Sequence, residues 1–457
     1  MVTTLPAPVA APTSPKRDFP SPKPNSILMW ALGFVNRWFI LSGLPLLRHI
    51  PVVRDLPGVR GYLRVRIDLP AADRARLDRA VNSRTAAFVG PNHPEFGTDW
   101  MIDKEISTLV APRLACWAAH DIVASAPAFW CANNLVSNNG GDAAMEYSIQ
   151  SALAGTAVLL HPEGTVRWTS DKIHPLFGGI AEMALETARR AAHVQSERPA
   201  RPVYIVPIVW KLVYDRDVSA AMHADMRRIE IALDLSRGDE LDVPARFHLL
   251  QENILSRQAS HFGYPLESPR HADFFDRQTA FRAWLVADLE TRYTIEPSDS
   301  IDRRIRRLDR AIRADQSRPR DDIARVAEAA RLGGFTREVY ATPLLSQEQI
   351  AESVKRIRSA LLRHGLANTV HNNLPRPYGA RIAHVRVPEP ILVDPRRAAP
   401  DHDAYARELL DRTQSAMQQA VDAINAEHAS KVGARSHPNP FIAGQHASGT
   451  RSEVHAG

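Results

Sequence analysis

The spacing of hydrophobic positions changes several times along the chain, and each change predicts an element. Apolar and charged residues alternate in 62–69 (YLRVRIDL), which predicts a half-exposed strand, and the amphipathic run at 71–84 predicts a helix. Continuous apolar runs predict buried strands at 85–90 (TAAFVG), 156–160 (TAVLL) and 203–212 (VYIVPIVWKL). Helical spacing occurs at 102–119, 142–153 and 179–193, whereas 121–124 and 129–134 are expected to be short and extended.

This order of elements predicts an α/β fold with a mostly parallel sheet flanked by helices. In open sheets of this kind, ligands bind at the carboxyl ends of the strands. The loop containing His93, the loop at 161–168 and the residues after Pro207 follow three of the predicted strands. We therefore expect them to face one crevice.

From about residue 236 the pattern becomes helical and rich in arginine. Residues 302–322 carry Ile305, Leu308 and Ile312 at helical spacing, and further helices are predicted at 347–364 and 405–426. The arginine cluster at 303–307 is most simply a solvated helix face, with anionic lipid as the alternative partner. These helices could cap the first domain, form a dimer contact or bind a membrane, and the sequence does not choose.

The predicted organisation has five parts. A disordered tail at 1–26 and another at 430–457 enclose an apolar segment at 27–58, an α/β domain at 60–235 and a mostly α-helical extension at 236–429. Asn36, Arg37, Gly43 and Pro45 interrupt the apolar segment before it is long enough to span a bilayer. Its aromatic and basic residues favour a helix lying on a membrane surface, and a core helix is the alternative.

The overall charge is mildly basic. The 457 residues hold 57 Lys and Arg against 51 Asp and Glu, a net charge of +6, which suits an anionic surface or substrate without requiring nucleic acid. Two cysteines are too few for a disulfide framework and favour a reducing compartment. The histidines show no recurrent ligand spacing, so no metal site is expected.

Three short motifs carry the candidate chemistry. Asn92-His93 lies in the loop NHPEFGTD, Glu163-Gly164-Thr165 lies in HPEGTVRW, and VPIV begins at Val206. Their order, spacing and position after buried strands resemble the glycerol-phosphate and lysophosphatidate acyltransferase family. The resemblance covers roughly residues 60–212, under half of the chain.

The resemblance implies that His93 is a general base oriented by Asp99. A neutral imidazole suits the deprotonation of a hydroxyl that attacks a thioester, and a carboxylate on the other ring nitrogen fixes the tautomer. Glu95 and Asp103 are less favoured orienters. The resemblance also implies that the second loop binds the acceptor through Glu163, Gly164, Thr165 and Arg167, with Asn92 beside the base. The alternative for Glu163 is a structural role, in which its carboxylate organises the loop.

The chain departs from the family pattern at several points. Five residues separate His93 from Asp99 instead of four, which on a regular helix would turn the two side chains apart. Pro94 and Gly97 make a non-helical turn plausible. His161 stands where the family has an aromatic residue, and Arg167 comes one residue late. The segment 129–141 has four asparagines and no arginine. Its Asn-Asn-Gly-Gly run at 138–141 is expected to form a turn, and contact of the four asparagines with the acceptor is the alternative.

The function expected from the resemblance is transfer of a fatty acyl group to a glycerolipid such as lysophosphatidate. The acyl donor is acyl-CoA or acyl-carrier protein as co-substrate, with no other cofactor. The expected location is cytoplasmic, on the inner face of the cell membrane, bound to its anionic surface. The alternatives are an idle lipid-binding or scaffold relative, and an acyltransferase or hydrolase acting on another polar lipid. The oligomeric state is left open.

Overall fold

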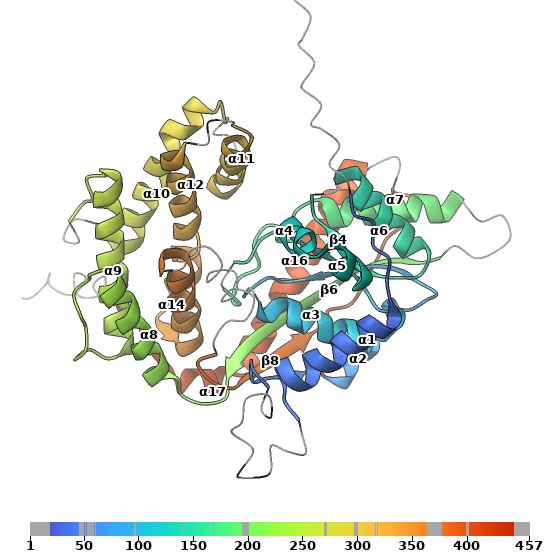
Figure 1. The fold of residues 1–457 in the computed structure, drawn as a ribbon, viewed down its shortest axis with the longest axis horizontal. Coiled ribbons are helices and arrows are strands. Elements are labelled where there is room, and N and C mark those ends of the chain that lie inside the picture. The colour runs from blue at the N-terminus through green and yellow to red at the C-terminus, as the bar shows by residue number, and fades with distance from the viewer. Residues whose placement is uncertain are drawn as a thin grey trace, which may run out of the picture.

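The computed structural model describes residues 19–44, 50, 52, 59, 61–95, 97–139, 141–167, 169–193, 201–268, 272–296, 300–315, 317, 319–362, 377–398 and 402–442. An α/β part and a helical part lie side by side (Figure 1). The α/β part contains an eight-stranded sheet in which β1, β8, β6, β2, β5, β3 and β4 are neighbours in that order and β9 also pairs with β6. The α/β prediction is therefore confirmed.

The sheet is mixed but mostly parallel. Its strands are β1 (Val65–Asp68), β2 (Ala86–Pro91), β3 (Ala115–Ala118), β4 (Leu135–Ser137), β5 (Val158–Leu159), β6 (Val203–Tyr214), β8 (Arg381–Arg386) and β9 (Ile391–Leu392). Only β8 and β9 run antiparallel to β6, while the other pairs are parallel. The carboxyl ends of β2 and β5 consequently lie at the same edge.

Helices cover both faces of the sheet because its central strands are apolar on both sides. On β2, Phe88 packs in one core cluster and Val89 in another. The Phe88 side is covered by α6 (Gly141–Leu153), α7 (Gly179–His193) and α16 (His402–Glu427), and the Val89 side by α2 (Ala71–Ala80) and α3 (Thr98–Leu109). The chain between β3 and β4 forms α4 (His120–Ser125) and α5 (Pro127–Ala132).

The apolar N-terminal segment forms α1 (Ser26–Val35) and a π-helical continuation, η1 (Asn36–Leu41). One side is anchored to α3, since Asn36 donates to the Met101 carbonyl (2.8 Å) and Arg37 pairs with Glu105. The other side leaves Trp30 and Phe34 60% and 45% exposed. Within the described part of the chain we find no helix with the length and hydropathy that a bilayer-spanning segment needs.

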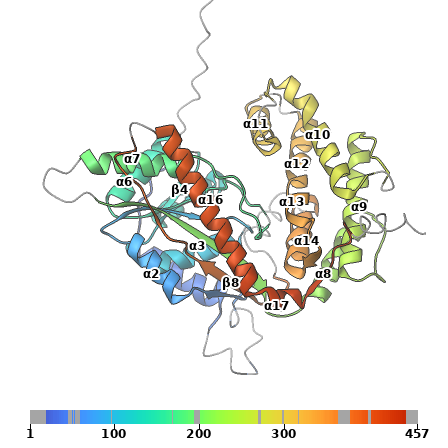
Figure 2. The same cartoon turned by 180° about the vertical axis from the view of Figure 1, so that it is seen from behind.

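The sequence-based boundary at residue 235 does not separate the two parts of the structure. The chain returns to the α/β part, where β8 inserts between β1 and β6, and α16 runs across the back of the sheet (Figure 2). β8 belongs to the core of the sheet, because five of its six residues are buried. Sequence patterning did not identify this strand.

The helical part has its own core. It consists of α8 (Ser219–Ala232), α9 (Val243–Phe262), α10 (Phe274–Arg292), α11 (Ile301–Ala314), α12 (Arg320–Leu332), α13 (Arg337–Tyr340) and α14 (Gln347–Leu362). Phe335 lies at the centre of a group of rings to which Phe247, Phe274, Phe275 and Phe441 also belong. Most of the predicted helical extension therefore folds around one hydrophobic centre.

Both predicted tails are partly ordered. Near the N-terminus, the backbone N–H groups of Lys23 and Asn25 donate to the carbonyls of Cys131 and Ala132. Near the C-terminus, α17 (Ala429–Gly433) leads to β10 (Ser436–Pro438), which pairs antiparallel with β7 (Leu344–Ser346). The predictions for 1–18 and 443–457 lie outside the described residues.

Prolines explain three other differences from the sequence prediction. The helix expected at 102–119 ends at Leu109, and Pro112, which cannot continue a helix, precedes β3. The segment expected to be extended at 129–134 is largely helix α5, which has Pro127 at its first position. The single helix expected at 302–322 is divided before α12, where Pro319 is the N-cap.

Candidate functional site

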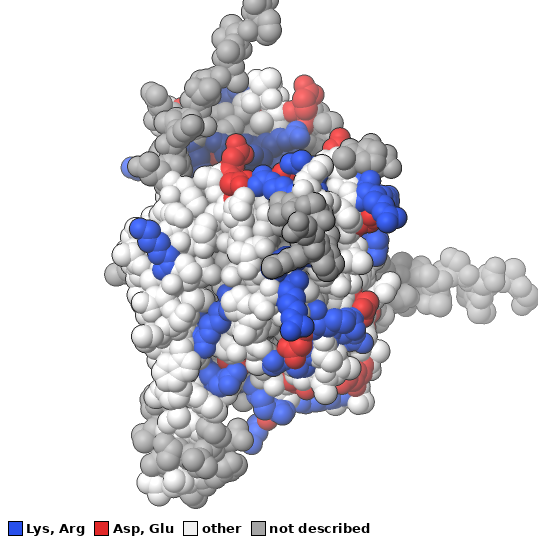
Figure 3. Space-filling model, turned by 90° about the vertical axis from the view of Figure 1, so that its right-hand side faces the viewer, with Lys and Arg blue, Asp and Glu red and all other residues white. Residues whose placement is uncertain are grey.

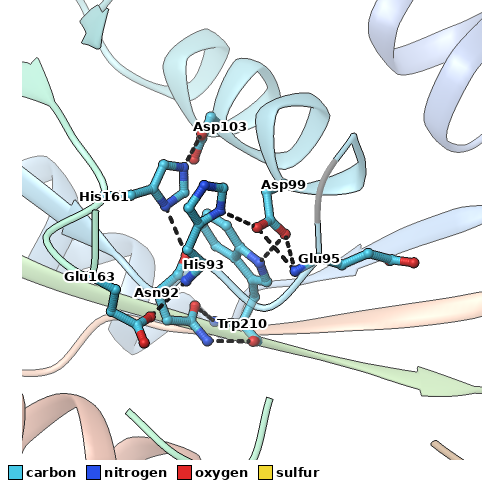
Figure 4. Close-up of polar contacts among 8 residues, drawn as sticks. All are labelled: Asn92, His93, Glu95, Asp99, Asp103, His161, Glu163 and Trp210. Atoms are coloured by element: carbon cyan, nitrogen blue, oxygen red, sulfur yellow. Dashed lines mark hydrogen bonds and ion pairs between the residues drawn. The ribbon is translucent and has the colours of Figure 1, made fainter. Parts of the chain in front are cut away.

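The loop after β2 brings His93 and Asp99 together. Gly97 adopts a φ of 81° and α3 begins only at Thr98, so His93, Pro94, Glu95 and Gly97 do not belong to a regular helix. Asp99 lies in the first turn of α3, and Nδ1 of His93 is 2.6 Å from its Oδ2 (Figure 4). The expected contact is present despite the five-residue spacing.

Asp99 is surrounded by hydrogen-bond donors. The indole Nε1 of Trp210, from β6, donates to Oδ1 (3.2 Å), and the backbone N–H of Glu95 donates to Oδ2 (3.1 Å). Burial raises the pKa of Asp99, the carboxylates of Asp103 and Glu95 raise it further, and these donors oppose the rise. We assign the ionised form, because these two donors and Nδ1 of His93 are directed at one carboxyl group and stabilise a carboxylate.

His93 has the environment of a neutral base. Burial lowers its pKa well below the usual value, and the positive charges of His161 and Arg167 add to this effect. Since Nδ1 faces Asp99, the neutral tautomer carries its proton there and leaves a lone pair on Nε2. Among the described residues none bonds to Nε2, and the side chain is 17% exposed.

A second histidine-aspartate pair lies against the first. His161, which follows β5, stacks on His93 with ring centroids 3.9 Å apart (Figure 4). Its Nδ1 lies 3.0 Å from the Asn92 carbonyl and its Nε2 lies 2.9 Å from Oδ2 of Asp103. Both partners accept hydrogen bonds, so both ring nitrogens must carry protons. Burial opposes this charge, but Asp103 outweighs it and raises the pKa of His161.

Asn92 and Glu163 hold the two loops in register. The Asn92 side chain exchanges two hydrogen bonds with the backbone of Trp210, at 2.9 and 3.1 Å. Glu163 accepts from the backbone N–H of His93 (2.9 Å) and of His174 (3.0 Å), and its pKa is raised by burial. These contacts support a positioning role for both residues, as the alternative interpretation of Glu163 suggested.

Of the other three residues of the second loop, Thr165 and Arg167 line a cavity. Gly164 has a φ of 70° and, with Thr165, is exposed. The backbone N–H of Arg167 donates to the His93 carbonyl (2.9 Å), which fixes this loop next to the histidine. Thr165 and Arg167 line a cavity of about 630 Å³ shared with the helical part.

Glu95 has a role that the sequence did not reveal. Its carboxylate is buried between Lys355 of α14 (2.7 Å) and Arg381 of β8, and it points away from Asp99 (Figure 4). Burial would raise its pKa, but these two cations lower it to about 2. Glu95 therefore links the His93 loop to the C-terminal half, and no local signal in the sequence could have suggested this link, because its partners are more than 250 positions away.

The asparagines of 129–141 are engaged within the protein. Asn133 accepts from Lys104, Asn134 donates to the Leu114 carbonyl, and Asn138 accepts from the backbone N–H of His120. Asn138 and Asn139 of the Asn-Asn-Gly-Gly run form a turn directly after β4. This arrangement agrees with the interpretation as a turn.

A largely apolar cavity of about 480 Å³ lies beside the histidine pairs. Its wall includes Trp100, Met101, Ile122, Trp130 and Leu135, and it also includes Asp103, the partner of His161. Cys116 contributes to this wall, and burial raises the pKa of its thiol to about 12, so the thiol is protonated. The cavity can accommodate a hydrocarbon group next to Asp103.

One group of potential metal ligands occurs among the described residues. Asp68, His384 and His428 offer ligand atoms within 4.8 Å of one another. However, Nδ1 of His384 is in contact with Oδ2 of Asp68 (2.7 Å), and Arg386 forms an ion pair with the same oxygen (3.5 Å). A guanidinium beside the carboxylate opposes a metal cation, and we assign no metal there.

Comparison with known protein families found no family pattern that matches the chain, and a search of curated proteins also found no match.

Proposed function

We propose that this protein is an O-acyltransferase in which His93 is the general base and Asp99 orients it. The observation that carries the proposal is the 2.6 Å contact between Nδ1 of His93 and Asp99, combined with an Nε2 that no described residue occupies. A histidine with these contacts can remove a proton, through Nε2, from a hydroxyl that is bound within hydrogen-bonding distance.

The reaction follows from that position. The acceptor oxygen transfers its proton to Nε2 of His93 as it attacks the thioester carbonyl, and collapse of the adduct breaks the carbon–sulfur bond. The departing thiolate then takes the proton from the imidazolium. The donor is acyl-CoA or acyl-carrier protein, and the acceptor is a glycerolipid such as lysophosphatidate. The 480 Å³ apolar cavity suits the acyl chain.

A peripheral position on the inner face of the cell membrane is part of the proposal. Ile27, Trp30, Phe34 and Phe39 are between 43% and 80% exposed, and Trp30 stacks on Phe34 with centroids 5.8 Å apart. The side of the α/β part drawn in Figure 3 has a broad area with few charged residues. An exposed aromatic surface of this kind fits an interfacial anchor, with Arg37 paired to Glu105 and not directed at lipid phosphates.

The test is incorporation of labelled acyl-CoA into lysophosphatidate by the purified protein. We expect His93→Ala to lower kcat/KM by about 10²-fold or more, because the base is lost. His193→Ala, at the exposed end of α7, is the matched control and should retain wild-type activity. Inert wild-type protein would support the scaffold alternative, and release of free fatty acid without acceptor would support a hydrolase.

Membrane attachment is tested by co-sedimentation with anionic vesicles. We expect Trp30→Ser with Phe34→Ser to weaken binding several-fold, because each removes exposed apolar surface. These changes are preferable to deleting α1, since its buried side contributes Met29 and Gly33 to the fold. Unchanged binding would show that these exposed aromatic residues do not anchor the protein on the membrane.

A further inference from the structure

The helical part forms one wall of a cavity whose opposite wall is the second candidate loop. The cavity measures about 630 Å³ and is lined by Thr165 and Arg167 from that loop and by residues of α11, α12 and α14. It lies close to the proposed base, because the Arg167 backbone bonds directly to the His93 carbonyl. A ligand held there would lie beside the reacting groups.

Three arginines in this cavity come from separate elements. Arg167 belongs to the loop, Arg306 to α11 and Arg356 to α14. No described carboxylate forms an ion pair with any of the three. The acidic lining residues are already compensated, since Asp302 pairs with Arg282 and Asp309 with Arg313. The cavity thus keeps an excess of positive charge.

The three guanidinium groups are held in place by neutral contacts. Arg306 lies over the Phe177 ring at 4.5 Å, and Arg356 donates to the Ala330 carbonyl at 2.7 Å. Nη2 of Arg167 donates to the Glu163 carbonyl at 3.4 Å, while its buried Nε has no hydrogen-bond partner among the described residues. A Cβ on Gly334 would lie 0.5 Å from Nη1 of Arg356, so glycine is required for this arginine to occupy its position.

Such a cluster is unfavourable without an anion. Burial and neighbouring cations, Arg331 and Arg167 among them, lower the pKa of Arg356 to about 9, and burial with Arg167 lowers that of Arg306. Guanidinium groups bind phosphate oxygens through paired donors, and an anion would relieve the repulsion. The lining also has apolar side chains, among them Ile305, Ile323 and Val326.

We propose that Arg306 and Arg356 of the helical part, together with Arg167, form a binding site for a phosphate group attached to a less polar body. This goes beyond the resemblance, which concerns only the loop containing Arg167. As a substrate site it rests on the proposed acyltransferase function, and the phosphate then belongs either to the acceptor or to the coenzyme A of the donor. In either case the helical extension completes the substrate site.

The test is direct binding to the full-length protein, measured by calorimetry at low ionic strength with inorganic phosphate, coenzyme A and a short-chain lysophosphatidate. We expect saturable binding that weakens with salt, and about tenfold or greater weakening in Arg306→Gln. Arg310→Gln removes the same charge from an exposed position on α11 and should change affinity less than about twofold. The ligand that loses most affinity in Arg306→Gln identifies the source of the phosphate.

Absence of saturable binding by all three ligands, or equal effects of Arg306→Gln and Arg310→Gln, would overturn the proposal. If Arg306→Gln does not fold, Ala327→Phe, at an exposed lining position, fills the cavity instead, and unchanged affinity in that variant would be equally contrary. Binding that depends on Arg306, without any acyl transfer, would support the phosphate site and contradict the acyltransferase function. Acyl transfer that needs His93 but not Arg306 would support the acyltransferase function and contradict the phosphate site.

Discussion

Two histidine-aspartate pairs lie face to face in this protein, and their different hydrogen-bond partners give them different chemistry. His93 has one nitrogen directed at Asp99 and the other without a described partner, whereas both nitrogens of His161 face acceptors. The first ring can therefore exchange a proton and the second is held as a cation. Because the rings are 3.9 Å apart, the cation also keeps the neighbouring base neutral.

The role of a histidine is not determined by its residue type or by an aspartate partner alone. Both aspartates lie on α3, and both are buried. What differs is the second ring nitrogen: Nδ1 of His161 donates to the Asn92 carbonyl, whereas Nε2 of His93 has no partner among the described residues. A positioning carbonyl is enough to convert a potential base into a fixed charge.

The largest expected effect comes from breaking the first pair. Asp99→Asn should lower kcat/KM for acyl transfer by about 10²- to 10⁴-fold, because an amide can donate to Nδ1 and favour the tautomer with its proton on Nε2. The fold should persist, which circular dichroism can check. Activity within a few-fold of wild type would show that Asp99 does not orient the base.

A third carboxylate, Glu95 in the loop before α3, is paired with cations instead of a histidine. Glu95→Gln leaves Lys355 and Arg381 without their carboxylate and should lower the free energy of unfolding by about 3–5 kcal/mol. Urea unfolding measures this loss, and an unchanged midpoint would contradict it.

The same carboxylate predicts a pH dependence of stability. The pKa of Glu95 is lowered from 4.5 to about 2 in the folded protein. A lowered carboxyl pKa stabilises the fold above the unfolded value, and that contribution is lost as the pH falls from about 4.5 towards 2. Glu95→Gln should therefore flatten the acid side of the unfolding profile, and a profile parallel to wild type would exclude this residue as the cause.

A smaller effect is expected from removing the fixed cation. His161→Phe should raise the pKa of His93 and move the acidic limb of the kcat/KM profile to higher pH by about one unit or more. Activity at pH 8 should change little, since the base is neutral there in both proteins. The double variant His161→Phe with Asp103→Asn separates loss of the cation from exposure of its carboxylate, and an unmoved limb in both variants would refute the coupling.

The sequence predicted those features that depend on local pattern. The strands containing Phe88 and Ile205 were recognisable as apolar runs, and α7 was predicted with its observed ends. The His93 and Asp99 contact was expected from a motif, and Gly97 explained how an irregular turn permits it. Local chemistry was sufficient for these elements.

Features formed by distant segments were not predictable in this way. The insertion of β8 beside β6 and the pairing of Lys355 with Glu95 join residues more than 150 positions apart. The bond between His161 and Asp103 spans 58 positions, and neither residue alone distinguishes a base from a held cation. Such contacts depend on tertiary packing, for which no pattern along the chain is diagnostic.

The most direct test of the account is nitrogen NMR of the histidine rings at pH 7, assigned with His93→Ala and His161→Phe. We predict that His93 is neutral with its proton on Nδ1, and that His161 carries protons on both nitrogens. A charged His93, or a proton on its Nε2 in the neutral ring, would contradict the assignment of this residue as the base.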